Sequence, residues 1–430
     1  MTGELIVLLE GRPVGTLVHH PKGRLGFFYN AEWRGADHAY PVSLSLPLPA
    51  NMHGSQALES FLWGLLPDSE RILESWARKF QTSPRNLFSL ISHVGEDCAG
   101  AVQFIRPERL HDVISGKADA VAWLSEAQVA GRLKALREDY AAWRLPRDTG
   151  QFSLAGAQPK TALIFDKEKW GIPSGRVPTT HILKPPTGAF DGHAENEHIC
   201  LTVARACGLP VAVSHVQRFE KEVAIVLERY DRQMPGKKIM RIHQEDLCQA
   251  LGILPSRKYQ NEGGPSAANI VELLRTYSGE AGDDVWTFAL AVGFNWIIAG
   301  TDAHAKNYSL LITHGNYVRL APLYDIASVL PYPRIDTKRA KMSMKIGSKY
   351  LMTEIGLRDW QRFAAELRLN FSDYHAELTR MADRIPDEAA AARDAARGEG
   401  LRHKILDSLV DALAKRARAC GRILRYAAGP

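Results

Sequence analysis

Asp302, Asn307 and Asp325 could together transfer a phosphoryl group. Such a reaction needs one carboxylate to orient the attacking hydroxyl, and several further oxygen atoms to hold Mg²⁺ on the triphosphate. Asp302 would supply that carboxylate, while the amide oxygen of Asn307 and the carboxylate of Asp325 are ligands of the kind that Mg²⁺ prefers. Taken alone, each of the three is better explained as a helix cap or a turn residue. Their order along the chain is what favours a phosphoryl-transfer site.

The residues before Asp302 predict a rigid support for it. Residues 285–298 are apolar on nearly every side, which is typical of a buried helix. Asn295 and the length of the stretch argue against a membrane span, which needs about 20 apolar residues. We expect Gly300 to end this helix and Asp302 to stand on the loop that follows.

A hairpin is expected between Asn307 and Asp325. Residues 308–313 and 317–321 have the composition of strands and flank a short run of turn residues. Such a hairpin would return the chain so that Asp325 lies beside Asp302 and Asn307.

A second group of residues, further upstream, predicts a site for a nucleotide. Residues 153–160 form a turn rich in small side chains, which let backbone N–H groups approach phosphate oxygens. A predicted strand at residues 161–165 follows, and residues 166–171 are expected to form the next turn. The strand at residues 180–184 ends in Lys184, and protein kinases bind the α- and β-phosphates with a lysine in this position.

A helix should follow this strand. It is expected to start near Glu195 and to stop at residues 208–210. Glu197 on the helix could pair with Lys184, as a helix glutamate pairs with the strand lysine of protein kinases.

Residues 213–219 and 222–228 predict a further hairpin. It leads to Glu228, Arg229 and Tyr230, a hinge whose backbone could bind adenine. Most of these features are common when taken singly, and a lysine at a strand end usually faces water. Their order favours a kinase, although the chain lacks the G-x-G-x-x-G, H-R-D and D-F-G motifs of eukaryotic protein kinases.

Several blocks of sequence stand out: residues 8–17, 95–100, 153–160, 181–184, 228–232, 243–252, 301–307 and 322–325. Together they resemble the HipA family, the serine/threonine kinase toxins of bacterial toxin–antitoxin modules. The resemblance extends from near the N-terminus to about residue 350, and beyond it the chain is similar only in being helical. It implies an α+β, two-lobed, protein-kinase-like fold, distantly similar to phosphoinositide kinases, with an N-terminal β-rich subdomain and a mainly helical C-terminal lobe.

The resemblance also implies roles for single residues. Asp302 would be the catalytic base, Asn307 and Asp325 would bind Mg²⁺, and Ser153 would be an autophosphorylation site whose modification expels its loop and stops the kinase. Negative charge added beside a bound triphosphate would repel it, which agrees with that mechanism. Pro159 stands where the family leads us to expect Glu, so the loop should be stiffer here. ATP would be bound by Ala155, Gly156, Ala157, Gln158, Pro159, Lys160, Lys184, Glu228, Arg229, Tyr230, His304, Ala305, Lys306, Asn307, Tyr324 and Asp325.

The same resemblance implies partners. The protein would phosphorylate a bacterial target, by family precedent an aminoacyl-tRNA synthetase such as glutamyl-tRNA synthetase, and so inhibit translation and arrest growth. It would bind a HipB-like antitoxin and reach operator DNA mainly through that complex, in association with the nucleoid. Basic residues of the last helix could contact DNA phosphates, but a solvated helix face is the more economical explanation. These residues are Lys404, Lys415, Arg416, Arg418, Arg422 and Arg425.

The composition is that of an ordinary globular protein. The chain has 430 residues, of which 24% are charged and 45% hydrophobic, enough for a large core and for two or three domains. Its net charge of +6 is mild support for an acidic partner. No signal peptide and no membrane span is expected, so we predict a cytoplasmic protein without a membrane partner. The five cysteines lack C-x-x-C spacing, so neither a disulfide framework nor zinc is expected, and Cys200 and Cys207 should lie in the core.

We expect three domains. Residues 1–110 should form the β-rich subdomain, with strands at residues 4–9, 14–19 and 25–29, a turn at 11–13, a helical part from about Ala57 and a closing strand at 100–105. Residues 111–230 should form the nucleotide-binding lobe, entered through a polar helical stretch. Residues 231–430 should be mainly helical, with a strand at 341–346, an alanine-rich helix at 386–400 and a mobile, substrate-proximal loop at 257–265.

Two other functions stay open at this point. One is a non-catalytic, nucleotide-binding co-repressor that acts with an antitoxin on operator DNA. The presence of every expected metal and phosphate ligand argues against it. The other is a kinase for a lipid head group or small molecule, which the lack of a membrane-binding amphipathic segment disfavours.

Overall fold

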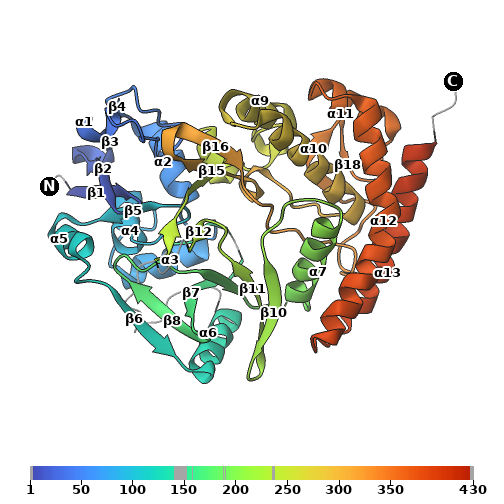
Figure 1. The fold of residues 1–430 in the computed structure, drawn as a ribbon, viewed down its shortest axis with the longest axis horizontal. Coiled ribbons are helices and arrows are strands. Elements are labelled where there is room, and N and C mark those ends of the chain that lie inside the picture. The colour runs from blue at the N-terminus through green and yellow to red at the C-terminus, as the bar shows by residue number, and fades with distance from the viewer. Residues whose placement is uncertain are drawn as a thin grey trace. The chain divides into compact units, whose positions relative to one another are not determined.

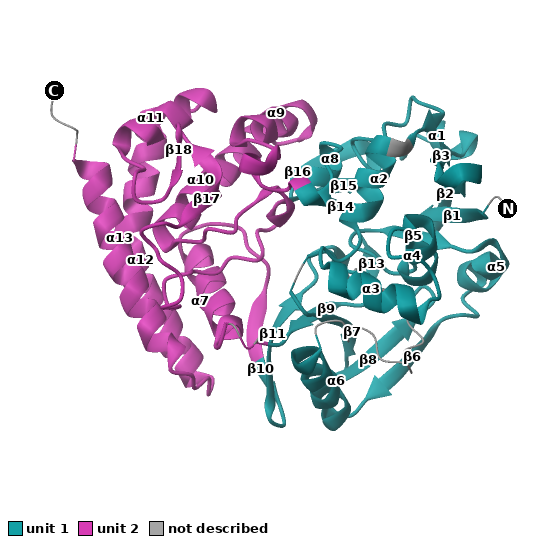
Figure 2. Cartoon of the chain, turned by 180° about the vertical axis from the view of Figure 1, so that it is seen from behind, with its two compact units in different colours: residues 1–185, 217–256, 309–321 teal, residues 186–216, 257–308, 322–430 magenta. Residues whose placement is uncertain are grey.

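The computed structural model describes residues 3–139, 153–156, 158–186, 188, 190–234 and 238–426. The chain divides into two compact units, and each is assembled from three separate stretches of sequence (Figure 2). Unit 1 comprises residues 1–185, 217–256 and 309–321, and unit 2 comprises residues 186–216, 257–308 and 322–430.

Unit 1 begins with a five-stranded antiparallel sheet in the order β4-β3-β2-β1-β5 (Figure 1). Glu10 and Gly11 both have positive φ and make the two-residue turn between the first two strands, which pairs Leu9 with Arg12. The turn expected at residues 11–13 is therefore wrong, because Arg12 and Pro13 already lie in β2. The strands are β1 (Gly3–Leu9), β2 (Arg12–His19), β3 (Leu25–Tyr29), β4 (Met52–His53) and β5 (Val102–Ile105), and the helices are α1 (Ala31–Arg34), α2 (Ser55–Gly64), α3 (Glu70–Lys79), α4 (Leu87–Val94) and α5 (Pro107–Ser115).

A six-stranded sheet in the order β10-β11-β9-β7-β8-β6 forms the second part of unit 1, apart from residues 214–216 of β10, which are assigned to unit 2. Helix α6 (Glu126–Glu138) packs Val129, Ala130 and Leu133 against apolar side chains of this sheet. The turn expected at residues 166–171 is shorter than predicted, because only Lys167 and Glu168 form it, both with positive φ. The strands are β6 (Ala120–Leu124), β7 (Thr161–Asp166), β8 (Lys169–Ser174), β9 (His181–Lys184), β10 (Ser214–Phe219) and β11 (Glu222–Glu228).

Three short ladders and one helix complete unit 1. The hairpin predicted near residues 308–321 is confirmed as β15 (Ser309–Thr313) and β16 (Tyr317–Leu320). A third strand, β14 (His243–Asp246), pairs with β15 and was not predicted. The remaining elements are β12 (Arg232–Gln233), β13 (Met240–Arg241) and α8 (Leu247–Ala250).

Unit 2 is helical around α10 (Ala281–Ile298), whose side chains are nearly all buried. Gly293 lets α12 (Phe371–Gly398) approach closely, since a Cβ there would lie 2.1 Å from Leu378 Cδ2. Helices α12 and α13 (Ile405–Arg425) run side by side (Figure 1). The predicted strand at 341–346 is confirmed as β17 (Lys341–Ile346), followed by β18 (Lys349–Leu351). The other helices are α7 (His193–Ala206), α9 (Ala267–Tyr277) and α11 (Leu357–Glu366).

The alanine-rich helix differs from its prediction. We expected it at residues 386–400, but α12 begins at Phe371 and continues through Pro386. The apolar side chains of Tyr374, Leu378 and Met381 are buried before that proline, so packing outweighs the local preference for a helix start there.

Half of the predicted basic face of α13 is engaged inside unit 2. Arg416 donates to the main-chain oxygen of Trp296 at 3.3 Å, and Lys404 lies 3.2 Å from Asp191. Arg425 pairs with Asp383. These contacts give the three side chains a structural role, and a role in binding DNA stays a prediction.

Candidate active site

The loop of residues 301–307, called the catalytic loop below, is anchored by the end of α10. The helix ends at Ile298, and Ala299 caps it with φ of 55°, so the end predicted at Gly300 is wrong by one residue. Gly300 is nevertheless required, because a Cβ there would lie 2.3 Å from Asn295 Oδ1. Its N–H donates to the main-chain oxygen of Asn295 at 2.7 Å. A rigid buried helix therefore sets the position of the catalytic loop.

Asp302 is exposed, yet neighbours hold both its side chain and its backbone. Its Oδ1 accepts a hydrogen bond from the Tyr259 hydroxyl at 2.6 Å. Its main-chain oxygen accepts from Nδ2 of Asn307 at 2.7 Å and from the N–H of His304 at 2.8 Å. The carboxylate is thus accessible to another molecule while its position is fixed.

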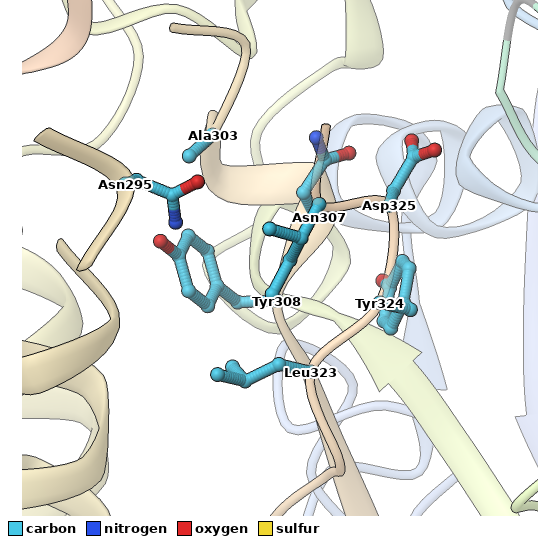
Figure 3. Close-up of a pocket in the computed structure, with 8 residues that line it drawn as sticks. Asn295, Ala303, Asn307, Tyr308, Leu323, Tyr324 and Asp325 are labelled. Carbon is cyan, nitrogen blue, oxygen red and sulfur yellow. The ribbon is translucent and has the colours of Figure 1, made fainter. Parts of the chain in front are cut away.

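Asn307 and Asp325 line one small pocket in unit 2. Their polar ends point to the same side of it (Figure 3). Carboxylate and amide oxygens suit Mg²⁺, which keeps few protein ligands and takes others from phosphate and water. Among the described residues, no group of three or more His, Cys, Asp or Glu could hold a metal ion by itself. The donor set therefore fits a magnesium ion that is shared with a triphosphate.

The backbone of Asp325 is strained and is fixed on both sides. Its φ is 58°, a region that residues other than Gly seldom adopt and that costs of order 1–3 kcal/mol. Leu323 exchanges backbone hydrogen bonds of 2.8 and 2.9 Å with residues 210–212. The N–H of Ser328 donates to Asn196 Oδ1 at 3.0 Å. These bonds hold the segment in the conformation that turns the Asp325 carboxylate toward the pocket.

The other predicted residues of this loop have a different position. His304, Ala305 and Lys306 are buried and do not line the pocket. Tyr324 does line it, and its hydroxyl donates to the main-chain oxygen of Lys306 at 2.8 Å. That His304, Ala305 and Lys306 bind the nucleotide stays a prediction.

Sequence reasoning missed five residues of the pocket: Asn295, Ala303, Tyr308, Leu323 and Ile326. Burial raises the pKa of the Tyr308 hydroxyl above its ordinary value, and the neighbouring amide of Asn295 opposes this effect. A polar residue in an otherwise apolar helix is a signal that could have identified Asn295. The apolar members carry no such signal.

The predicted phosphate loop lies in unit 1. Lys160 is buried and donates from Nζ to the main-chain oxygen of Ala155 at 2.6 Å, so it spans the loop. Gly156 has φ of 102°, and a Cβ there would lie 2.7 Å from Lys160 Nζ. Gln158 is half-buried and Pro159 is buried, while Ala157 lies outside the described residues.

Ser153 is fully buried in this structure. Its hydroxyl donates to the main-chain oxygen of Leu65 at 2.6 Å, and its N–H donates to that of Asp97 at 2.9 Å. Its hydroxyl could accept a phosphate only after the loop has left this position.

Lys184 and the predicted hinge are joined by the β9–β11 ladder, which pairs Lys184 with Ile225 and Glu228 with His181. Lys184 is largely buried, Glu228 is exposed and Tyr230 is half-buried. The backbone of Arg229 is already used, because its N–H donates to Thr180 at 2.9 Å and its oxygen accepts from Arg232 at 3.1 Å. That the backbone of Glu228, Arg229 and Tyr230 binds adenine stays a prediction.

The side chain of Arg229 belongs to a buried charge cluster that the sequence did not reveal. The cluster consists of Asp97, Arg229, Asp231, Arg232 and Arg241. Burial would raise the pKa of Asp97, but the guanidinium groups of Arg232, Arg241 and Arg229 hold it well below its usual range. Because Asp97 also accepts the N–H of Ser153 through its main-chain oxygen, the cluster connects the N-terminal part of unit 1 to the phosphate loop.

The structure thus brings the predicted residues together in two groups. Asn307, Tyr324 and Asp325 line one pocket in unit 2, and Asp302 is joined to them through its main-chain oxygen, which accepts from Asn307. The phosphate loop, Lys184 and the hinge lie in unit 1. Pairing of Glu197 with Lys184 stays a prediction. Within the part of the chain that the structure describes, no helix is both long enough and apolar enough to cross a bilayer.

Comparison with known proteins identifies relatives along nearly the whole chain. A model of the HipA-like C-terminal domain matches residues 152–393, and one of the HipA N-terminal domain matches residues 5–105. Y4mE of Sinorhizobium fredii, described as a candidate kinase, is 35% identical over 393 residues, covering 90% of this chain and 91% of Y4mE. The serine/threonine-protein kinase toxin HipA of Shewanella oneidensis is 28% identical over 392 residues, covering 84% of this chain and 82% of that protein.

A solved structure confirms the predicted fold class. The HipA chain in a complex of HipA, HipB and operator DNA from Shewanella oneidensis MR-1 has a TM-score of 0.82 and 24% identity, and the match covers 98% of both chains. The α+β kinase-like fold, with its N-terminal sheet and helical C-terminal part, is therefore shared. By sequence, the chain is homologous to serine/threonine-protein kinases.

Proposed function

The chain belongs to the HipA family, and we propose that it transfers the γ-phosphoryl group of ATP to serine or threonine hydroxyls of a protein. The observation that carries the proposal is the grouping of Asp302, Asn307 and Asp325 in unit 2. Asp302 is held by hydrogen bonds on its side chain and on its backbone, and it remains exposed. That is what a base needs if it must receive a hydroxyl from another molecule.

The proposed chemistry assigns each group of residues one task. Asp302 accepts the proton of the attacking hydroxyl as the hydroxyl oxygen bonds to the γ-phosphorus; the bond from that phosphorus to the bridging oxygen breaks, and ADP leaves. Asn307 and Asp325 would hold Mg²⁺, which supplies positive charge to the phosphate oxygens when it is bound. Lys184 and the loop of residues 155–160 hold the α- and β-phosphates, and the backbone of Glu228 and Tyr230 binds adenine.

We further propose that the protein is the toxin of a toxin–antitoxin module. The support is its similarity to the kinase toxin HipA and to a HipA that was solved with HipB and operator DNA. Its partner would be a HipB-like antitoxin in the bacterial cytoplasm, and its target, by family precedent, an aminoacyl-tRNA synthetase. Ser153 would be its autophosphorylation site, and phosphate there could not fit beside Leu65.

Replacing Asp302 with Asn tests the proposal. The variant keeps the shape of the side chain but removes the base, so phosphate transfer should fall by about 10² to 10⁴-fold. The assay is incubation with Mg²⁺ and [γ-³²P]ATP, followed by mass spectrometry for phosphate on Ser153. Asp387→Asn, at an exposed position of α12 in the same unit, is the matched control and should remain active.

Two outcomes would contradict the proposal. Full transfer by Asp302→Asn would remove the assigned role of Asp302. A wild-type protein that binds ATP but transfers no phosphate would favour the non-catalytic co-repressor.

A further inference from the structure

One side chain from outside the catalytic loop bonds directly to the carboxylate of Asp302. The Tyr259 hydroxyl donates to Oδ1 at 2.6 Å, a short distance typical of an O–H donor and a charged acceptor. Tyr259 belongs to residues 257–265, called the Tyr259 segment below. This segment lies in unit 2 together with the catalytic loop.

The Tyr259 segment contacts the catalytic loop at further points. The N–H of Ala305 donates to the main-chain oxygen of Lys258 at 3.4 Å. The ring of Tyr259 meets the imidazole of His304 edge-on, with 5.0 Å between centroids and 84° between planes. Backbone and ring therefore both hold Tyr259 against the loop that carries Asp302.

The Tyr259 segment is also stiffened internally. The main-chain oxygen of Tyr259 accepts from the N–H groups of Glu262, at 3.0 Å, and Gly264, at 2.9 Å. No other residue fits at Gly264, because a Cβ there would lie 2.2 Å from the main-chain oxygen of Arg257 and 2.7 Å from that of Tyr259. Gln260 Oε1 accepts from the N–H of Lys345 in β17 at 2.7 Å, which ties the segment to a strand.

Two roles are consistent with a hydroxyl on the catalytic carboxylate. The hydroxyl could block the position that an acceptor hydroxyl must take, or it could orient the carboxylate. A blocking group must be able to leave, and Tyr259 is held by its ring, by its own backbone and by both of its neighbours in sequence. The contacts therefore favour orientation.

We infer that Tyr259 is a positioning residue, whose hydroxyl holds the Asp302 carboxylate in the orientation that receives the acceptor hydroxyl. The inference rests on the proposed function and adds to it a residue that lies well before the catalytic loop in the sequence. Asp302 is exposed, and loss of this bond removes one restraint on the rotamer of its side chain. Catalysis depends on such alignment, and binding of ATP does not.

Tyr259→Phe isolates the hydroxyl, because it keeps the ring and its packing on His304. The rate of ATP turnover, measured as labelled protein plus released phosphate, is followed against ATP concentration with Mg²⁺ present. We expect kcat to fall about tenfold and KM for ATP to change less than about twofold, since the lost hydrogen bond acts on alignment alone. Tyr277→Phe, at an exposed tyrosine that ends α9 in the same unit, should match the wild type.

Gly264→Ala provides a second measurement that leaves the phenol in place. It displaces the main-chain oxygen of Tyr259 and should lower kcat in the wild-type background. In the Tyr259→Phe background it should lower kcat much less, because both changes act on the same hydrogen bond.

The outcomes separate this inference from the proposed function. A Tyr259→Phe variant as fast as the wild type, or faster, overturns the inference and leaves the proposed function standing, provided that Asp302→Asn is inactive. The inference is also overturned if the decreases in kcat caused by Gly264→Ala and Tyr259→Phe are fully additive in the double variant. A wild-type protein that turns over no ATP overturns both.

Discussion

Replacing Asp97 with Asn should destabilise unit 1 strongly, because the change removes one charge from a buried cluster. The Asp97 side chain is 10% exposed, and those of Arg229 and Arg232 are each 2% exposed. Its Oδ1 accepts from Arg232 at 3.0 Å and from two nitrogens of Arg241, and its Oδ2 accepts twice from Thr179. Asparagine keeps the shape but brings one donor where only acceptors fit.

The size of the expected loss of stability follows from the charges that remain in the cluster. The cluster contains three guanidinium groups and two carboxylates, so its net charge is +1, and the variant would make it +2. Removing one partner of a buried ion pair costs about 3–5 kcal/mol, because the other charge stays buried without compensation. Solvent does not screen this cluster, so we apply the full value. For a unit of this size, the loss corresponds to a decrease in Tm of roughly 6–20 °C.

The assay is thermal unfolding followed by tryptophan fluorescence, with urea unfolding as a second measure. Glu222→Gln is the matched control, since Glu222 also binds an arginine through both oxygens; its side chain is 12% exposed, like that of Asp97, but its partner Arg137 is 43% exposed, so solvent screens this pair. Exposed pairs contribute about 0.2–1 kcal/mol, so this control should change Tm little.

A double variant tests the reasoning about charge. Adding Arg241→Gln to Asp97→Asn returns the net charge of the cluster to +1 and should recover part of the lost stability. The argument from uncompensated charge is refuted if Asp97→Asn unfolds at the same temperature as Glu222→Gln. It is also refuted if the stability lost in the double variant equals the sum of the losses in the two single variants.

Two further predictions concern a buried acid and the magnesium site. Burial raises the pKa of Glu245 from 4.5 to about 8, while hydrogen bonds from Leu44 and Ser43 oppose the rise. Because this acid binds its proton more tightly in the folded state, its contribution to stability is full below pH 4.5 and is lost as pH rises through about 8. The free energy of unfolding, measured in urea between about pH 5 and pH 9, should therefore decline as pH rises. Glu245→Gln should abolish this decline. Asp325→Asn should raise the Mg²⁺ concentration that gives half-maximal ATP turnover at least about tenfold, because it removes the only carboxylate proposed to bind the ion. An unchanged dependence of turnover on Mg²⁺ concentration would exclude Asp325 as a ligand.

Features that depend on local pattern were predictable from the sequence. The apolar stretch that became α10, the hairpin of β15 and β16, and the strand β17 each have a clear periodicity or turn composition. The grouping of Asn307 with Asp325 followed from the hairpin alone. The roles of these residues in catalysis stay predictions.

Features that depend on distant contacts were not predictable. The strand β14 consists of four polar residues and is a strand only because it pairs with β15, far along the chain. Asp97, Arg229 and Arg241 lie in separate segments, and each alone is typical of a surface. Tyr259 likewise has no local pattern that points to Asp302, because the two are brought together only by folding of unit 2.

The order in which the chain visits its two units has a consequence for synthesis on the ribosome. Unit 1 requires residues as late as 321, and unit 2 requires residues from 186 onward to the last helix. A nascent polypeptide that has emerged only as far as Gly300 has therefore completed neither unit, although strand β9, which carries Lys184, is already made. Helices α12 and α13 pack against α10, which anchors the catalytic loop, and both are made after Asp302, so copies terminated before these helices should be inert.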